Sequence, residues 1–203
     1  MIIGLTGKKR SGKTTASDYL MYRFNGHLID FNSVRINFKD ALLDELRANF
    51  PALLQAIADS YDHSDYDGMD PWTVDKLFRE KPPMMRALLQ NYGTEVRRGD
   101  DPLYWIRRWN QRAKEEQRHV ITDDVRFLNE AQAVKDLGGI VVRIVREDLP
   151  STDTHQSEAE MDQIEPDYTI SVKTGEHEKL YDFLDFLIES NESTSIEQRE
   201  IKV

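Results

Sequence analysis

The 203-residue sequence has no cysteine, no long apolar run and fewer basic than acidic residues. The lack of cysteine excludes a disulfide framework and any thiolate metal site. No apolar stretch approaches the roughly 20 residues that a membrane-spanning helix needs, and the chain begins directly with a strand-like segment. We therefore expect a cytoplasmic protein without a membrane partner. With 27 Lys and Arg against 37 Asp and Glu, the formal net charge of −10 argues against a general nucleic-acid-binding protein.

The scarce basic residues are concentrated in the middle of the chain. Residues 79–126 contain eleven Lys and Arg against eight Asp and Glu, whereas residues 147–203 contain four against sixteen. Such a distribution favours a local pocket for an anionic substrate within an otherwise acidic protein.

One stretch near the start fits the phosphate-loop pattern completely. It reads Gly-Lys-Lys-Arg-Ser-Gly-Lys-Thr over residues 7–14, after an apolar strand-like run (residues 1–6) and before a helix expected over residues 15–23. Glycines let successive backbone N–H groups line a cup around a polyphosphate, and the helix that follows adds its positive dipole end. The expected ATP-binding residues are Gly7, Lys8, Lys9, Arg10, Ser11, Gly12, Lys13, Thr14 and Thr15.

Two side chains of this loop have chemistry of their own. Lys13 is the positive charge expected at the β- and γ-phosphates of the nucleotide. The Thr14 hydroxyl is an expected Mg²⁺ ligand.

Further apolar runs predict a parallel sheet. Strands are expected over residues 26–31, 119–124, 140–145 and 168–172, in addition to the first. Helical periodicity is expected over residues 38–61 with a division at Pro51, and over 84–92, 102–117, 128–137 and 178–188, with a break at residues 93–95. The sequence thus predicts an α/β fold of P-loop kinase type, with a five-stranded parallel sheet and helices on both faces.

The expected domain organisation is one kinase domain over residues 1–190. It would carry a helical acceptor-binding insertion at about 36–118 and a lid at about 146–160, with a flexible tail over 191–203. An acidic segment, residues 59–75, does not have the ligand spacing of a calcium loop and is interpreted as solvated. Trp109 is expected in the core, while Trp105 suits either the core or a binding site.

Polar residues at the predicted strand ends are the remaining candidates. Ligands of such sheets bind outside the carboxyl ends of the strands. Asp124 after the third strand suits a magnesium-associated carboxylate, although Asp123 or Asp124 could instead cap a helix. Arg126 suits an arginine that faces phosphates, and Arg143 and Arg146 near the end of the fourth strand could neutralise charge on a transferring phosphoryl group. His155, Ser157 and Glu158 are interpreted as supporting the geometry of a loop.

Four segments together resemble the bacteriophage deoxynucleoside monophosphate kinase family. They are Gly4–Thr15, Leu89–Glu95 with Arg97 and Trp105, Ile121–Glu130, and His155–Glu158. The resemblance implies transfer of the γ-phosphoryl group of ATP to a deoxynucleoside 5′-monophosphate with Mg²⁺. It places Gln90, Glu95, Arg97, Trp105 and Arg126 at the acceptor, and Arg146 in the lid; Lys13, Arg126, Asp124 and Arg146 would then form the catalytic set, with Thr14 and Asp124 at the metal.

Two other interpretations stay open. Dephospho-coenzyme A kinase, or another small-metabolite kinase on the same fold, would differ in its acceptor. A nucleotide-dependent switch or binding module is a third hypothesis, but the Asn-Lys-x-Asp motif of common GTPases is missing from the sequence. The accepted bases, a homodimer, and a viral source with a host-cytoplasmic location are further open points.

Overall fold

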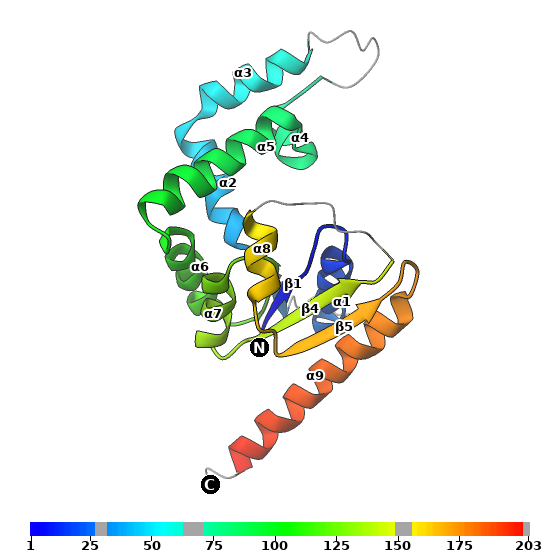
Figure 1. The fold of residues 1–203 in the computed structure, drawn as a ribbon. Coiled ribbons are helices and arrows are strands. Elements are labelled where there is room, and N and C mark those ends of the chain that lie inside the picture. Colours follow the sequence, from blue (N-terminus) through cyan, green and yellow to red (C-terminus); the bar gives the residue numbers. More distant parts are fainter. Residues whose placement is uncertain (27–31, 63–70, 149–155, 201–203) are drawn as a thin grey trace. The chain divides into compact units, whose positions relative to one another are not determined.

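Five parallel strands form one sheet in the order β2-β3-β1-β4-β5 within the described part of the chain. The computed structural model describes residues 1–26, 32–62, 71–148 and 156–200 (Figure 1). The strands are β1 (Ile2–Thr6), β2 (Ser33–Arg35), β3 (His119–Val125), β4 (Ile140–Arg146) and β5 (Tyr168–Val172). The fold class predicted from the sequence is confirmed.

The helices lie between and after the strands in the sequence, and a run of them separates β2 from β3. They are α1 (Lys13–Asn25), α2 (Phe38–Asn49), α3 (Pro51–Asp62), α4 (Val74–Glu80), α5 (Pro83–Gln90), the π-helix η1 (Asn91–Arg98), α6 (Tyr104–Glu115), α7 (Leu128–Asp136), α8 (Gln156–Gln163) and α9 (His177–Glu200). No helix among the described residues is both long and apolar enough to span a membrane.

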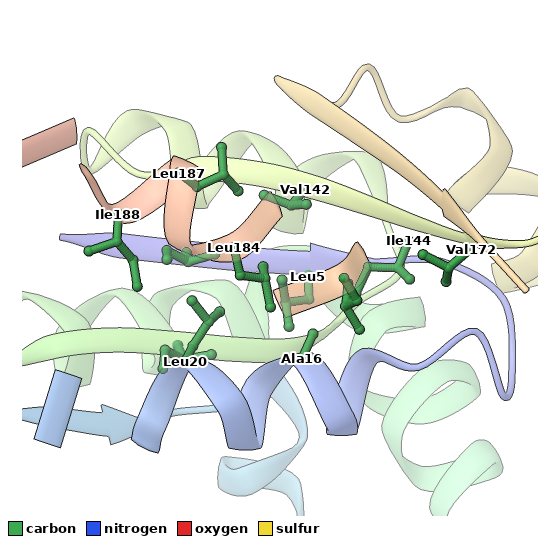
Figure 2. Close-up of a cluster of buried hydrophobic side chains, with 12 residues drawn as sticks. Leu5, Ala16, Leu20, Val142, Ile144, Val172, Leu184, Leu187 and Ile188 are labelled. Atoms are coloured by element: carbon green, nitrogen blue, oxygen red, sulfur yellow. The ribbon is translucent and has the colours of Figure 1, made fainter. Parts of the chain in front are cut away.

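Alternating side chains of β1 separate the two faces of the sheet. Ile3 and Leu5 are fully buried on the face covered by α1 and α9, where they join a cluster with Leu20, Leu184 and other residues (Figure 2). Gly4 faces the other side, and a Cβ on it would stand 3.1 Å from side-chain carbons of Val134 on α7. Helices therefore cover both faces, and the core lies between the sheet and these helices.

The chain divides into two compact units. The first comprises residues 1–37 and 112–203 and contains the sheet; the second comprises residues 38–111. The second unit has its own core, formed by α2 to α5 around Leu46, Leu54, Leu77 and Met85. Its limits lie close to those of the helical insertion that the sequence predicts.

Several element boundaries differ from the sequence predictions. The expected second strand lies outside the described residues except for Gly26, which ends α1 with a φ of 59°; the short edge strand β2 instead begins at Ser33. The predicted break at residues 93–95 is wrong, because η1 continues through them. Helix α9 does not end at Ile188 but extends to Glu200. Helices α4 and α8 lacked a clear apolar period and were not expected.

Candidate active site

The phosphate loop connects β1 to α1 through three residues with positive φ. These are Gly7 (φ 139°), Arg10 (φ 65°) and Gly12 (φ 106°). A Cβ on Gly7 would stand 2.3 Å from the Ile144 carbonyl oxygen of β4, so the loop can pass the sheet only with glycine at this position. Because α1 begins at Lys13, the loop ends at a helix N-terminus whose first N–H groups have no partner within the helix. This backbone is a cradle suited to a polyphosphate.

Lys13 closes this loop on itself. Its Nζ donates hydrogen bonds to the carbonyl oxygens of Gly7, at 2.5 Å, and Lys8, at 2.8 Å. The ammonium group is therefore held at the loop by hydrogen bonds to two backbone carbonyls. Thr14 follows on the first turn of α1 with an exposed side chain. The roles of both residues at the phosphates and the metal stay predictions.

Other loop side chains differ in their surroundings. The Ser11 side chain is buried, and its Oγ has no hydrogen-bond partner among the described residues. Lys8 forms an ion pair with Asp162 of α8, with 3.3 Å between Nζ and Oδ2, while Lys9 and Arg10 are exposed. Thr15 is half-buried in the first turn of α1. The positive charge at this loop is thus supplied by side chains that reach solvent.

Asp123 and Asp124 lie at a bulge-like irregularity, where β3 has one more residue than β1 between two paired positions. Gly4 pairs with Thr122, but Thr6 pairs with Val125, so the two aspartates occupy an irregularity at the end of the strand, beside the start of the phosphate loop. The Asp123 N–H donates to Asn37 Oδ1 at 2.9 Å, which fixes this backbone. Such an irregularity turns side chains away from the ladder and toward the end of the sheet.

The two aspartates differ in their contacts. The Asp123 carboxylate is buried and lies 3.7 Å from Arg35 Nε of β2, and Arg35 also pairs with Asp18 of α1. Asp124 is half-buried, and its Oδ1 accepts from Thr122 Oγ1 at 3.2 Å. The structural contacts of Asp123 make Asp124 the better candidate for a metal-associated carboxylate. The sequence points to Arg35 only as the last residue of a segment, residues 30–35, at the end of the expected second strand; its two ion pairs come from the structure.

Neither aspartate caps the next helix, so that alternative is wrong. Helix α7 begins at Leu128, and the buried Glu130 accepts from the backbone N–H groups of Arg126 (2.8 Å) and Phe127 (3.2 Å). A glutamate in the first turn thus satisfies the exposed donors that precede the helix. The turn holds the Arg126 backbone firmly, while its side chain is exposed.

The two arginines of β4 have separate roles. Arg143 Nη2 donates to the carbonyl oxygens of Met161 (2.8 Å) and Ile164 (2.5 Å) at the end of α8, so its guanidinium anchors that helix rather than facing a phosphate. Arg146 Nη1 donates to Lys173 O at 2.7 Å, and its Nη2 lies 3.0 Å from where a Cβ on Gly12 would stand. Arg146 is therefore a cation beside the phosphate loop. His155 lies outside the described residues.

Of the predicted acceptor residues, Arg126 belongs to the first unit, and the other four lie in the second unit, on α5, η1 and α6. Gln90 and Glu95 are exposed, and Arg97 is half-exposed. Trp105 is only 3% exposed, and its Nε1 donates to Gly93 O at 2.8 Å. The indole thus supports η1 from within the core, and the acceptor role of Trp105 stays a prediction. Trp109 is also buried and stacks on Phe38, with 4.6 Å between ring centroids, as expected.

A carboxylate that the sequence did not indicate lies next to Arg97. Glu45 of α2 is buried and accepts from Tyr92 Oη at 2.6 Å, from Tyr104 Oη at 2.8 Å and from Arg97 Nη2. Burial alone would raise the pKa of Glu45, but these hydrogen bonds and the Arg97 charge lower it below its usual value. Glu45 therefore stays ionised and holds Arg97 in place.

Comparison with known proteins gives an independent result. A family model described as deoxynucleotide monophosphate kinase matches residues 55–183. The chain belongs to the deoxynucleotide monophosphate kinase family. The match does not include residues 7–14, so the phosphate loop and the family match are separate observations. Together they make the protein a nucleotide kinase of phosphate-loop type.

Individual relatives of this deoxynucleotide monophosphate kinase family member are distant. A protein of Acanthamoeba polyphaga mimivirus, described as a "putative deoxynucleotide monophosphate kinase", is 29% identical over 194 residues, which cover 89% of this chain and 92% of the relative. Among solved structures, shikimate kinase from Aquifex aeolicus has a TM-score of 0.46 at 15% identity, and dephospho-CoA kinase from Campylobacter jejuni has 0.44 at 14%. Both comparisons cover 94% of this chain and 98% of the other.

Proposed function

We propose that the protein transfers the γ-phosphoryl group of ATP to a deoxynucleoside 5′-monophosphate, giving ADP and the diphosphate. The observation that carries this proposal is the phosphate loop, in which Lys13 is held at a backbone cradle that only glycine permits at residue 7. Family membership through residues 55–183 supports the class of acceptor.

On the donor side, the loop N–H groups and Lys13 would bind the β- and γ-phosphates of ATP. Phosphate oxygens can replace the neutral carbonyl oxygens of Gly7 and Lys8 that accept from Lys13 Nζ, with a gain in charge–charge attraction. Arg146 lies beside Gly12 and would neutralise charge that develops on the transferring group. These donors are fixed before the reaction, which is how electrostatic stabilisation acts in phosphoryl transfer.

The residues present also fit Mg²⁺. No group of three or more His, Cys, Asp and Glu suited to a metal occurs among the described residues, but Mg²⁺ in kinases is held by one or two protein oxygens, waters and substrate phosphates. The exposed Thr14 hydroxyl would bind the ion directly, and Asp124 would hold its water shell. When bound, the ion neutralises negative charge on the β- and γ-phosphates.

On the acceptor side, arginines are the proposed partners of the monophosphate. Arg126 follows β3 with an exposed side chain and a backbone fixed by Glu130. Arg97 would contribute from η1, with Gln90 and Glu95 nearby along the chain. Guanidinium groups suit this task because they bind phosphate oxygens in pairs.

An acceptor screen tests the proposal. The protein is incubated with ATP, Mg²⁺ and each of dAMP, dCMP, dGMP, dTMP and dephospho-coenzyme A, and both ADP and the phosphorylated acceptor are measured. We expect transfer to at least one deoxynucleotide. Transfer to dephospho-coenzyme A alone, or ADP release that no acceptor stimulates, contradicts the proposal.

Lys13→Ala tests the role of the loop in that reaction. Loss of a positioned cation at the transferring phosphate should lower kcat by on the order of 10²-fold or more. Lys179→Ala is the matched control, since Lys179 is an exposed lysine of α9 in the same unit. Near-normal turnover in Lys13→Ala would remove the phosphate loop from the mechanism.

A further inference from the structure

Glu45 is the centre of a polar cluster inside the second unit. Its carboxylate is 7% exposed, and its two oxygens have different partners. Oε1 accepts from Tyr92 Oη and Arg97 Nη2, while Oε2 accepts from Tyr104 Oη. Three elements, α2, η1 and α6, are joined in this way through one carboxylate.

A second arginine, Arg108, reaches the same carboxylate. Its Nη2 lies 3.8 Å from Glu45 Oε2 and donates to Tyr104 Oη at 2.9 Å. The guanidinium groups of Arg97 and Arg108 lie 4.9 and 5.0 Å from the centre of the Tyr104 ring. Two cations thus converge on one carboxylate and one aromatic ring.

The cluster has more positive charge than its own structure needs. One guanidinium is enough to compensate one buried carboxylate, and Arg97 already does this by a direct hydrogen bond. The hydrogen bonds lower the pKa of Glu45, and hydrogen bonds to Glu45 and Tyr92 raise the pKa of Arg97 despite its partial burial, so both stay charged. With Arg108 added, the cluster keeps a net charge of about +1 near pH 7.

The surplus charge faces solvent. The side chains of Arg97 and Arg108 are 33% and 50% exposed, whereas Glu45 lies beneath them. Arg97 uses Nε and Nη2 for contacts within the cluster, and Arg108 uses Nη2. Within the described residues, Nη1 of Arg97 and both Nε and Nη1 of Arg108 make no hydrogen bond to protein. Each arginine therefore presents donors outward while its other donors hold it in place.

We propose that Arg97 and Arg108 form a paired site for the 5′-phosphate of the acceptor and that Glu45 is the residue that positions both. This inference rests on the proposed function and adds two residues, Glu45 and Arg108, that neither sequence motifs nor the family resemblance indicate. A phosphate dianion matches two guanidinium groups better than one, because each provides parallel N–H donors. Tyr92 and Tyr104 would restrain the arginines and so reduce the conformational entropy lost on binding.

Arg108→Gln is the first test, since Arg108 is exposed and its loss leaves Glu45 paired with Arg97. Steady-state kinetics are measured with each of the four deoxynucleoside monophosphates and with ATP as the varied substrates. Loss of one charge-assisted contact should raise the acceptor KM about ten- to hundredfold and leave the ATP KM unchanged. Binding of the matching deoxynucleosides, which have no phosphate, should also be unchanged.

Glu45→Gln tests the positioning role. It keeps the shape of the side chain and removes the charge that holds both arginines, so it should raise the acceptor KM at least as much as Arg108→Gln. Far-UV circular dichroism and ADP affinity check that the fold and phosphate loop are retained. If Glu45→Gln does not fold, Arg108→Gln and Tyr104→Phe, which removes one hydroxyl from the cluster, decide the question by the same kinetic criterion.

Arg79→Gln is the matched control, because Arg79 is an exposed arginine of the same unit that forms an ion pair with its neighbour Glu80. It should leave the acceptor KM unchanged. Wild-type-like acceptor KM in Arg108→Gln, or an equal rise in the KM for acceptor and for ATP, overturns the inference while the proposed function stands. If the wild-type protein phosphorylates none of the four monophosphates, the proposed function and this inference both fail.

Discussion

Replacement of Gly7 by alanine should destabilise the first unit more than any other glycine substitution in the phosphate loop. The new Cβ would stand 2.3 Å from the Ile144 carbonyl oxygen and 2.8 Å from Ser11 Oγ. Ile144 lies in the middle of β4 and pairs with Ile170 of β5, so its carbonyl cannot retreat without disturbing the sheet. At Gly12 the nearest atom to a new Cβ is Nη2 of Arg146, at 3.0 Å, and this flexible side chain can move.

The magnitude has two parts. A positive φ costs an alanine about 1–3 kcal/mol, and forcing an extra carbon against packed backbone costs a further ~1–3 kcal/mol. The expected loss for Gly7→Ala is therefore roughly 2–6 kcal/mol, against a typical total stability of about 5–15 kcal/mol for a domain. Gly175 allows the cost of the positive φ to be measured without the cost of the close contact. Its φ is 91°, but nothing lies within 4 Å of a Cβ built there. Gly175→Ala should lose only the backbone part, about 1–3 kcal/mol.

Urea unfolding followed by far-UV circular dichroism measures these differences. All three tryptophans, Trp72, Trp105 and Trp109, lie in the second unit, so their fluorescence reports that unit and serves as an internal reference. If Gly7→Ala is destabilised no more than Gly175→Ala, the close approach of the loop to β4 is refuted. ATP affinity measured on the same proteins should fall strongly for Gly7→Ala and stay unchanged for Gly175→Ala.

Three further predictions concern the charged groups. Asp124→Asn should raise the Mg²⁺ concentration needed for half-maximal transfer, since the amide keeps the shape of the side chain and loses its charge; an unchanged Mg²⁺ titration would contradict this role. Arg126→Lys should raise the acceptor KM and spare the ATP KM, because lysine lacks the paired donors, while Arg79→Lys serves as control; weakened ATP binding would instead place Arg126 on the donor side. The lowered pKa of Glu45 contributes stability above its unfolded-state value of 4.5, and this contribution is lost as pH falls through the folded-state pKa. The tryptophan-monitored urea midpoint should therefore fall on acidification below about pH 4.5 in wild type and less steeply in Glu45→Gln, and parallel curves would show that Glu45 does not contribute.

The sequence predicts the sheet well where a strand contains a run of apolar residues. The ranges of β1, β3, β4 and β5 follow from short apolar runs bounded by polar residues, and β5 begins and ends at the residues expected. The phosphate loop is equally clear, because its function requires fixed residue types at fixed spacing. Edge strand β2 has three residues and one apolar side chain, Val34, so no apolar run marks it.

Helix boundaries are harder to predict than strands. A glycine can mark either a turn or close packing, and a helix can continue beyond the end of its apolar face. Gly93 was interpreted as a break, yet it lies inside η1, where a Cβ would stand 2.8 Å from Leu42 Cδ2. Glycine at this position therefore accompanies close packing against the Leu42 side chain rather than a turn. Helix α9 continues past Ile188 without an apolar face to indicate it, through residues such as Glu189 and Gln198 that have good intrinsic helix propensity.

The acceptor side shows the limit of reasoning from sequence most clearly. In the sequence Arg108 is indistinguishable from a surface arginine, and only its spacing of four residues from Tyr104 on one helix indicates a contact. Glu45, the residue that gives this pair its geometry, lies 59 residues before Tyr104 and belongs to no recognisable motif. Local spacing cannot reveal a carboxylate that the fold brings from another helix. Arg108 is therefore unsuitable as a neutral control for Arg126 or Arg97, and Arg79, with its exposed side chain, is the appropriate choice.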